Sequence, residues 1–155
     1  MNYKQIAVLI PYYDDYGQNS TCILFQDGSR DYRSYSVKHF IYCMFYQLHL
    51  DPNAVRFWTS QILGTKLNTP LIVDESLIFI PVKFRKSIGK QDGCFAYINS
   101  QSISSCGDYK ILLTSGETID ILSPKSYVLK KQNDARLLSY AYMDYKKQYE
   151  FMWKN

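Results

Sequence analysis

The stretch PLIVDESLIFIPVKFRKSIGK, residues 70–90, joins a mostly apolar segment to a segment whose charged side chains are all basic. Its first half contains two apolar runs separated by the polar triplet DES, a pattern that predicts two short strands joined by a turn. Its second half, from Pro81 to Lys90, contains cationic side chains and no acidic one. These side chains are Lys83, Arg85, Lys86 and Lys90. The sequence therefore predicts a buried strand followed directly by a concentrated positive loop.

The positive loop has two interpretations that its composition does not separate. Lysine and arginine side chains on a loop that a sheet holds in place can neutralise nucleic-acid phosphates and release their counterions. A charged turn can also do no more than keep the edge of a sheet soluble. If the loop is not the contact surface, Arg30 and Arg33 in an earlier predicted strand are the next candidates.

The strands on either side of this stretch predict a mainly antiparallel sheet. Asp27-Gly28 is a strong signal for a two-residue hairpin turn. In DYKILLTSGETIDIL, apolar residues alternate on both sides of Ser115-Gly116, which predicts a second hairpin whose glycine has positive φ. The expected strands are residues 4–11, 21–25, 30–37, 70–73 and 77–84, one straight or kinked segment within 93–106, and the two arms of 108–122.

One or two helices are expected before the quoted stretch. KHFIYCMFYQLHL, residues 38–50, is apolar nearly all round and fits a buried helix. DPNAVRFWTSQILG carries Asp51 as a cap and Gly64 as a stop, and its buried stripe would include Val55, Trp58 and Ile62. The prediction is one α+β domain over residues 1–155, with a mainly antiparallel core sheet over about 4–122, one or two central helices and a long C-terminal helix.

The C-terminal helix is expected over about residues 124–152. Apolar residues recur there at steps of three and four, which gives the helix an amphipathic face. That face is longer than a domain of this size needs for its own core, so we expect it to pair subunits. Docking on the helix's own sheet is an almost equal alternative. The expected interface residues are Leu138, Tyr142, Tyr145, Tyr149 and Met152.

Composition limits where the protein acts. The chain has 155 residues, four cysteines without a CxxC pair and a net charge of +4, which suggests one domain with reduced thiols. We find no signal peptide and no apolar run long enough to cross a membrane. We therefore expect a cytoplasmic protein with no membrane partner.

The sequence offers little for catalysis. Its seven glycines form no nucleotide-binding or hydrolase motif. Cys43 with His39 or His49 is the one thiol–base pair to consider, but no acid is placed to orient it, and buried Cys and His ordinarily belong to the core. The cysteines and histidines also lack the close spacing of zinc ligands. We therefore do not expect this protein to be an enzyme or to bind a metal or a cofactor.

The order of the segments resembles the ComK family, bacterial regulators of competence for DNA uptake. TPLIVDESLIFIPVK resembles the family's signature, YSVKHFIYC the stretch leading to its early cysteine, and YKILLTSGETIDIL the hairpin before its terminal helix. The resemblance covers about residues 6–142 and rests on the ordered set of segments. FAYINSQSISSCGDYKILLTSGETIDI is also similar, more weakly, to the last strands of LytTR-type DNA-binding domains.

The ComK resemblance implies a transcription regulator, an activator of competence, that binds double-stranded DNA at paired A·T-rich sites through the minor groove. That groove concentrates negative potential and attracts Arg and Lys from short loops. Paired sites imply a homo-oligomer, and a regulatory adaptor protein is a further candidate partner. The expected DNA-binding residues are Lys83, Arg85, Lys86, Lys90, Arg30 and Arg33. The alternatives are an interaction module or antagonist that does not bind DNA, and a LytTR-like DNA-binding domain.

Overall fold

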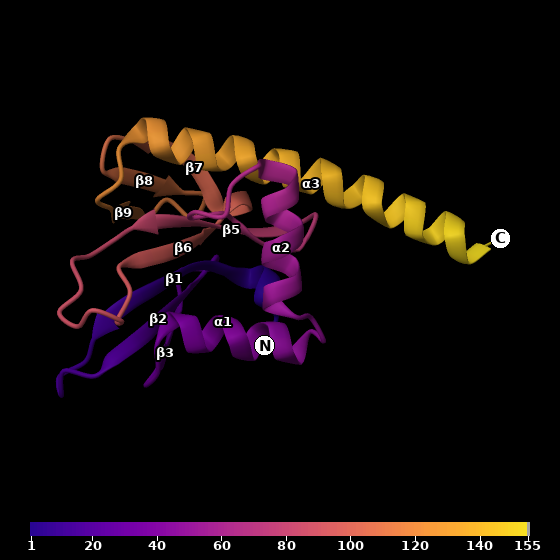
Figure 1. Ribbon diagram of the computed structural model, residues 1–155. Coiled ribbons are helices and arrows are strands. Elements are labelled where there is room, and N and C mark those ends of the chain that lie inside the picture. Colours follow the sequence, from indigo (N-terminus) through magenta and orange to yellow (C-terminus); the bar gives the residue numbers. More distant parts are fainter. Residues whose placement is uncertain (155) are drawn as a thin grey trace.

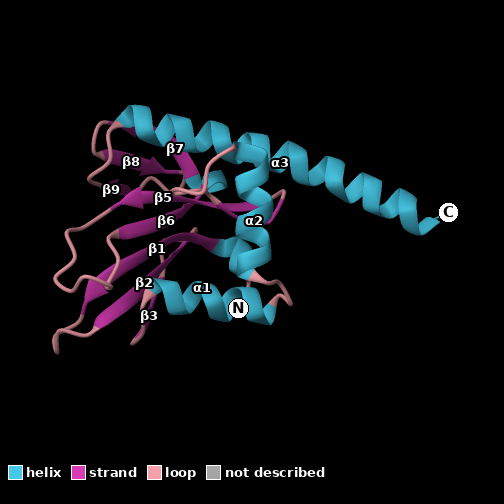
Figure 2. Cartoon of the chain, in the orientation of Figure 1, coloured by secondary structure: helices cyan, strands magenta, loops and turns pink. Residues whose placement is uncertain are grey.

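The computed structural model describes residues 1–154, and its centre is a six-stranded antiparallel sheet of order β3-β2-β1-β6-β5-β4 (Figures 1 and 2). Three further strands form a separate antiparallel sheet of order β7-β8-β9. The strands are β1 (Ile6–Tyr13), β2 (Asn19–Phe25), β3 (Arg30–Arg33), β4 (Leu71–Asp74), β5 (Leu77–Lys83), β6 (Phe95–Asn99), β7 (Ile103–Gly107), β8 (Lys110–Leu113) and β9 (Thr118–Asp120). The expected α+β class is confirmed, and the division into two sheets is a feature that the strand pattern did not predict.

Strand β5 divides the core into two halves. Successive side chains of a strand point to opposite faces of its sheet. Phe79 packs in one apolar cluster, with residues of α1, whereas Ile78 and Ile80 pack in another, with residues of α3 and the small sheet. Because both faces are covered, β5 is apolar at nearly every position. The two strands expected on either side of DES are confirmed as β4 and β5.

The chain leaves the large sheet at a kink after β6. A short 3-10 helix, Ser100–Ser102, separates β6 from β7. The buried Asn99 fixes this corner, because its Nδ2 donates to the Ile6 carbonyl at 3.0 Å and its Oδ1 accepts from the Gln101 N–H at 3.0 Å. The kinked form of the predicted segment within 93–106 is therefore confirmed.

Helix α1 (Val37–Gln47) packs on β1 and β2, and α2 (Pro52–Leu63) runs from α1 towards α3 beside β4 (Figure 1). The Asp51 carboxylate caps α2 by accepting from the Asn53 N–H at 2.9 Å, a contribution of about 1 kcal/mol. Gly64 ends the helix in the left-handed conformation, as expected. The predicted stripe of α2 is partly wrong, because Thr59 is buried and Ile62 is exposed.

Helix α3 (Lys125–Lys154) is continuous over 30 residues. Its first half packs on the domain through the buried Val128, Ala135 and Leu138. Leu138 is fully buried in the protein's own core, so its assignment to a subunit interface is corrected. The second half extends beyond the other elements (Figure 1).

None of the helices within residues 1–154 combines the length and the apolar composition that crossing a bilayer requires.

Gly116 provides a test of the β8–β9 hairpin. Its φ is 91°, and a Cβ added there would meet nothing within 4 Å. The cost of a side chain is therefore backbone strain alone, and Gly116→Val should lower the free energy of unfolding in urea by about 1–2 kcal/mol. Gly107→Val is the matched control, because Gly107 lies in β7 without positive φ and with equally open space. Equal stability of the two variants would contradict this account of the turn.

Candidate nucleic-acid interface

The cationic loop, defined as residues 83–94, connects β5 to β6 and projects next to the turn between β1 and β2 (Figure 1). Its base is closed by the backbone, because the N–H groups of Phe84 and Arg85 both donate to the Cys94 carbonyl. Lys83 ends β5, and its N–H donates to the Ser123 hydroxyl at 2.9 Å. Both the large sheet and the start of α3 therefore hold the loop in position.

Arg85 lies inside the base of the loop rather than at its tip. Its Nη2 donates to Asn19 Oδ1 at 2.6 Å and to the Asp92 carbonyl at 3.1 Å, and its Nε donates to the Gly93 carbonyl at 3.0 Å. The guanidinium also lies 4.3 Å from the centroid of the Tyr13 ring, within the range of a cation–π contact. These contacts make Arg85 a clamp for the loop, so it is not presented to a ligand as the sequence suggested.

Tyr13 and Asp92 complete the clamp. The Tyr13 hydroxyl donates to Asp92 Oδ2 at 2.7 Å and accepts from the Ile88 N–H at 2.8 Å. Asp92 Oδ2 also accepts from the Gly89 N–H at 3.0 Å. The hydrogen bond from Tyr13 and the one from Gly89 hold the pKa of Asp92 below its ordinary value. Side chains from β1 and from the loop itself thus order the loop backbone.

The three lysines of the loop remain available to contact a ligand. Lys83, Lys86 and Lys90 are exposed, and within the described part of the chain none of them forms an ion pair. The neighbouring β1–β2 turn carries Asp14 and Asp15, which reduce the positive potential at this end of the domain. Screening at physiological salt limits that reduction to groups within about 8 Å.

The two arginines of β3 form ion pairs with carboxylates. Arg30 bonds to Glu117, and Arg33 Nη1 donates to Asp31 Oδ2 at 2.7 Å. These hydrogen bonds raise the pKa of both arginines. Strand β3 is the outer edge of the large sheet and pairs with β2, whose first residue, Asn19, accepts a hydrogen bond from Arg85 of the loop. Arg30 and Arg33 differ from the loop lysines because their charges are paired with carboxylates.

The expected interface residues of α3 divide into a docked part and an exposed part. Tyr142 is half-buried and packs edge-on against Trp58 of α2, with ring centroids 6.1 Å apart. Tyr145 is 6.4 Å from the same Trp58 and 6.3 Å from Tyr149, whose ring stacks on it. Tyr145 and Tyr149 are about half exposed, and Met152 is 75% exposed. An aromatic ladder therefore runs from α2 onto the C-terminal half of α3.

Hydrogen bonds to Glu75 hold α3 to the domain as far as Lys146. Ser139 Oγ donates to the Glu75 carbonyl at 2.8 Å, and Lys146 Nζ donates to Glu75 Oε1 at 3.0 Å. We call the remaining residues, 147–154, the α3 tail. An apolar hollow of about 360 Å³ lies beside the aromatic ladder, lined in part by Leu50, Val55 and Trp58.

The possible catalytic pair gains no geometric support. No hydrogen bond joins Cys43 to His39 or His49 within residues 1–154, and His39 instead packs against the Tyr35 ring with centroids 4.7 Å apart. The same residues contain no cluster of three or more His, Cys, Asp or Glu side chains that could hold a metal ion.

Comparisons of the chain with protein-family models, curated proteins and solved structures gave no match. The function has to be inferred from the surfaces described above.

The clamp predicts different roles for two neighbouring cations of the loop. Arg85→Ala removes three hydrogen bonds and should lower the free energy of unfolding by about 1–3 kcal/mol, because hydrogen bonds to charged groups are the stronger ones. It should also speed amide hydrogen exchange across residues 84–94. Lys86→Ala, its matched control, should change neither quantity. If Arg85→Ala leaves both stability and exchange unchanged, Arg85 is not the clamp.

Proposed function

We propose that this chain is a DNA-binding transcription regulator of the ComK type that contacts A·T-rich duplex DNA through the cationic loop. The observation that carries the proposal is an ordered loop that presents three lysines without acidic partners. Ordering matters, because a loop held in its binding conformation loses less conformational entropy when it binds. The resemblance of the segment order to the ComK family supports the same conclusion.

The shape of the loop favours the minor groove. That groove is about 6 Å wide and excludes a helix, but it admits a narrow loop with cationic side chains. The adjacent β1–β2 turn projects in the same direction (Figure 1), and its acidic residues oppose the binding of phosphates there. Lys83, Lys86 and Lys90 are the proposed contact residues, with Arg85 as their support.

We also propose that two copies pair through the α3 tail. Most of the stability of a helix in a protein comes from tertiary packing rather than from helix propensity, so a helix that continues past its own domain is expected to gain stability from a partner. The aromatic ladder continues from the domain onto the tail, and the apolar hollow lies beside it. In a two-fold arrangement the tail of each copy would enter the hollow of the other, because a symmetric pair uses the same patch twice.

An interaction module without DNA binding is the second candidate. The exposed end of α3 and the acidic residues near the loop favour it. DNA binding separates the two candidates, since an interaction module would show no salt-dependent retention by duplex DNA.

Removing the loop lysines should weaken DNA binding and reduce its dependence on salt. Each phosphate contact adds about 0.9 to the slope of log K against log salt, so replacing Lys83, Lys86 and Lys90 by Ala should lower the slope by about 2–3. Replacing Lys4, Lys130 and Lys147 removes the same charge elsewhere and should lower it much less. The wild-type chain should also prefer an A·T-rich to a G·C-rich duplex in fluorescence anisotropy. Equal slopes for the two triple variants would place the contact surface elsewhere.

Charge placed on the ladder should separate the subunits without unfolding them. Tyr145→Glu with Met152→Glu puts carboxylates on two exposed residues of one helical face, and should convert a dimer to a monomer with unchanged circular dichroism. Lys147→Glu changes the net charge equally on the opposite face and should leave the dimer intact. Sedimentation velocity provides the measurement. A wild-type chain that stays monomeric at high micromolar concentration would rule out pairing in the absence of DNA.

A further inference from the structure

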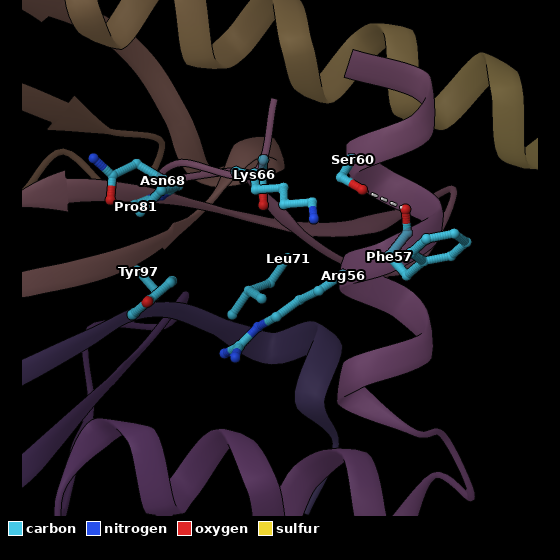
Figure 3. A pocket seen from close by; sticks show the side chains of 9 residues that line it. Arg56, Phe57, Ser60, Lys66, Asn68, Leu71, Pro81 and Tyr97 are labelled. Carbon is cyan, nitrogen blue, oxygen red and sulfur yellow. Dashed lines mark hydrogen bonds between the residues drawn. The ribbon is translucent and has the colours of Figure 1, made fainter. Parts of the chain in front are cut away.

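A cavity of about 430 Å³ lies between α2, the loop that follows it and strands β4, β5 and β6 of the large sheet. Figure 3 shows Arg56 reaching from α2 across the strands, with Lys66 pointing into the same space from the loop after α2. Leu71 of β4 and Tyr97 of β6 lie beside them. The cavity is remote in sequence from the cationic loop, and the DNA-binding proposal does not use it.

The charge of this cavity is not neutralised. Arg56 and Lys66 line it, no carboxylate does, and neither cation has an ion-pair partner among residues 1–154. Two positive charges that face one hollow raise the local potential and favour an anion with more than one negative charge. A guanidinium offers a fork that fits a phosphate group, and an ammonium adds a point charge.

The remaining lining combines apolar surface with polar groups. Leu71 and Pro81 provide the apolar part, and Tyr97 adds a half-buried aromatic ring. Burial raises the pKa of the Tyr97 hydroxyl, and the nearby Arg56 charge opposes that effect, so this hydroxyl stays a neutral hydrogen-bond donor. Asn68 and Thr69 also line the cavity and have side chains that can donate and accept. Such a lining suits a flat ring with polar edges better than a hydrocarbon tail.

A second hollow, of about 210 Å³, continues the cavity. It shares Arg56 and Tyr97 with the first and reaches Lys38 at the start of α1. Residues 91–94 of the cationic loop, among them Asp92, also line the second hollow, so its charge is mixed. The purely cationic part is the first cavity, which is where an anionic group is best stabilised.

We infer that this cavity binds a nucleoside monophosphate, with its phosphate on Arg56 and Lys66 and its ring on Tyr97, Leu71 and Pro81. The cavity volume lies within the range of about 300–1,000 Å³ that is usual for small-molecule sites. One nucleotide provides both features that the lining requires, a dianion and a planar ring with polar edges. Duplex DNA does not provide them together, because its bases are stacked and paired. If the protein is the proposed regulator, the nucleotide would be its small-molecule effector. Binding of the nucleotide to the cavity does not require that the protein binds DNA.

Isothermal titration calorimetry tests this inference with AMP, GMP, CMP and UMP on the full chain. At least one of the four should bind with a dissociation constant below about 1 mM. That nucleotide should bind more tightly than inorganic phosphate, which lacks the ring, and more tightly than its nucleoside, which lacks the phosphate. Arg56→Gln and Lys66→Gln should each weaken binding about tenfold or more, since a charge-assisted hydrogen bond contributes about one factor of ten or above.

Lys86→Gln is the matched control, because it removes an exposed cation outside the cavity and should leave nucleotide affinity unchanged. Arg56 and Lys66 are exposed, so unchanged melting temperatures are expected for both variants and would show that they fold. The inference is overturned if no monophosphate binds, if phosphate alone binds equally well, or if single-stranded DNA without a terminal phosphate binds there instead. Duplex binding by the wild-type chain separates the two proposals: a wild-type chain that binds duplex DNA but no monophosphate rejects the cavity assignment alone, and one that binds a monophosphate but no duplex rejects the DNA proposal alone.

Discussion

The alternation of side chains along β5 holds the two halves of the hydrophobic core together. Its odd positions, Leu77 and Phe79, pack in the cluster of α1, and its even positions, Ile78, Ile80 and Val82, pack in the cluster of α3 and the small sheet. A shift of one residue would exchange these two sets and place side chains of the wrong size and shape in both halves of the core. The register with β6, which pairs Lys83 with Phe95, therefore also fixes where the strand ends and where the cationic loop begins.

Neighbouring residues of the cationic loop have different roles: Arg85 orders the loop, and the lysines provide its accessible charge. Arg85 gives its hydrogen bonds to Asn19, Asp92 and Gly93, and the lysines on either side of it remain in water. An arginine suits the first role because its planar group has several donors in fixed directions, whereas lysine is a flexible point charge. The loop can therefore be rigid at its base and adaptable at its tip. That combination would let three cations meet phosphates whose spacing varies with DNA sequence.

Local patterns predicted most of the fold but not the partners of charged side chains. Asp51 and Gly64 bounded α2, and the hairpin around Gly116 followed from alternation and turn chemistry, because each depends on a few adjacent residues. The role of Arg85 depends on Asn19, which is 66 residues away in sequence, so composition counted it with the lysines. Leu138 was placed on a subunit surface because periodicity identifies the apolar face of a helix but not what covers it. The cavity was missed for the same reason, since Arg56 and Lys66 come together only through the end of α2.

Helix α2 stands between the two surfaces that are proposed to bind partners other than DNA. Arg56 faces the cavity, and Trp58 begins the aromatic ladder on α3. Two residues along a helix rotate by about 200°, so these side chains leave α2 on nearly opposite sides. A ligand that draws Arg56 towards the sheet would act on the same rigid element that supports Trp58. If nucleotide binding alters subunit pairing through α2, pairing must alter nucleotide affinity by the same factor, because coupling between two binding equilibria is reciprocal. Because Trp58 contacts both Tyr142 and Tyr145, α2 rather than the cationic loop is the element through which such coupling would pass.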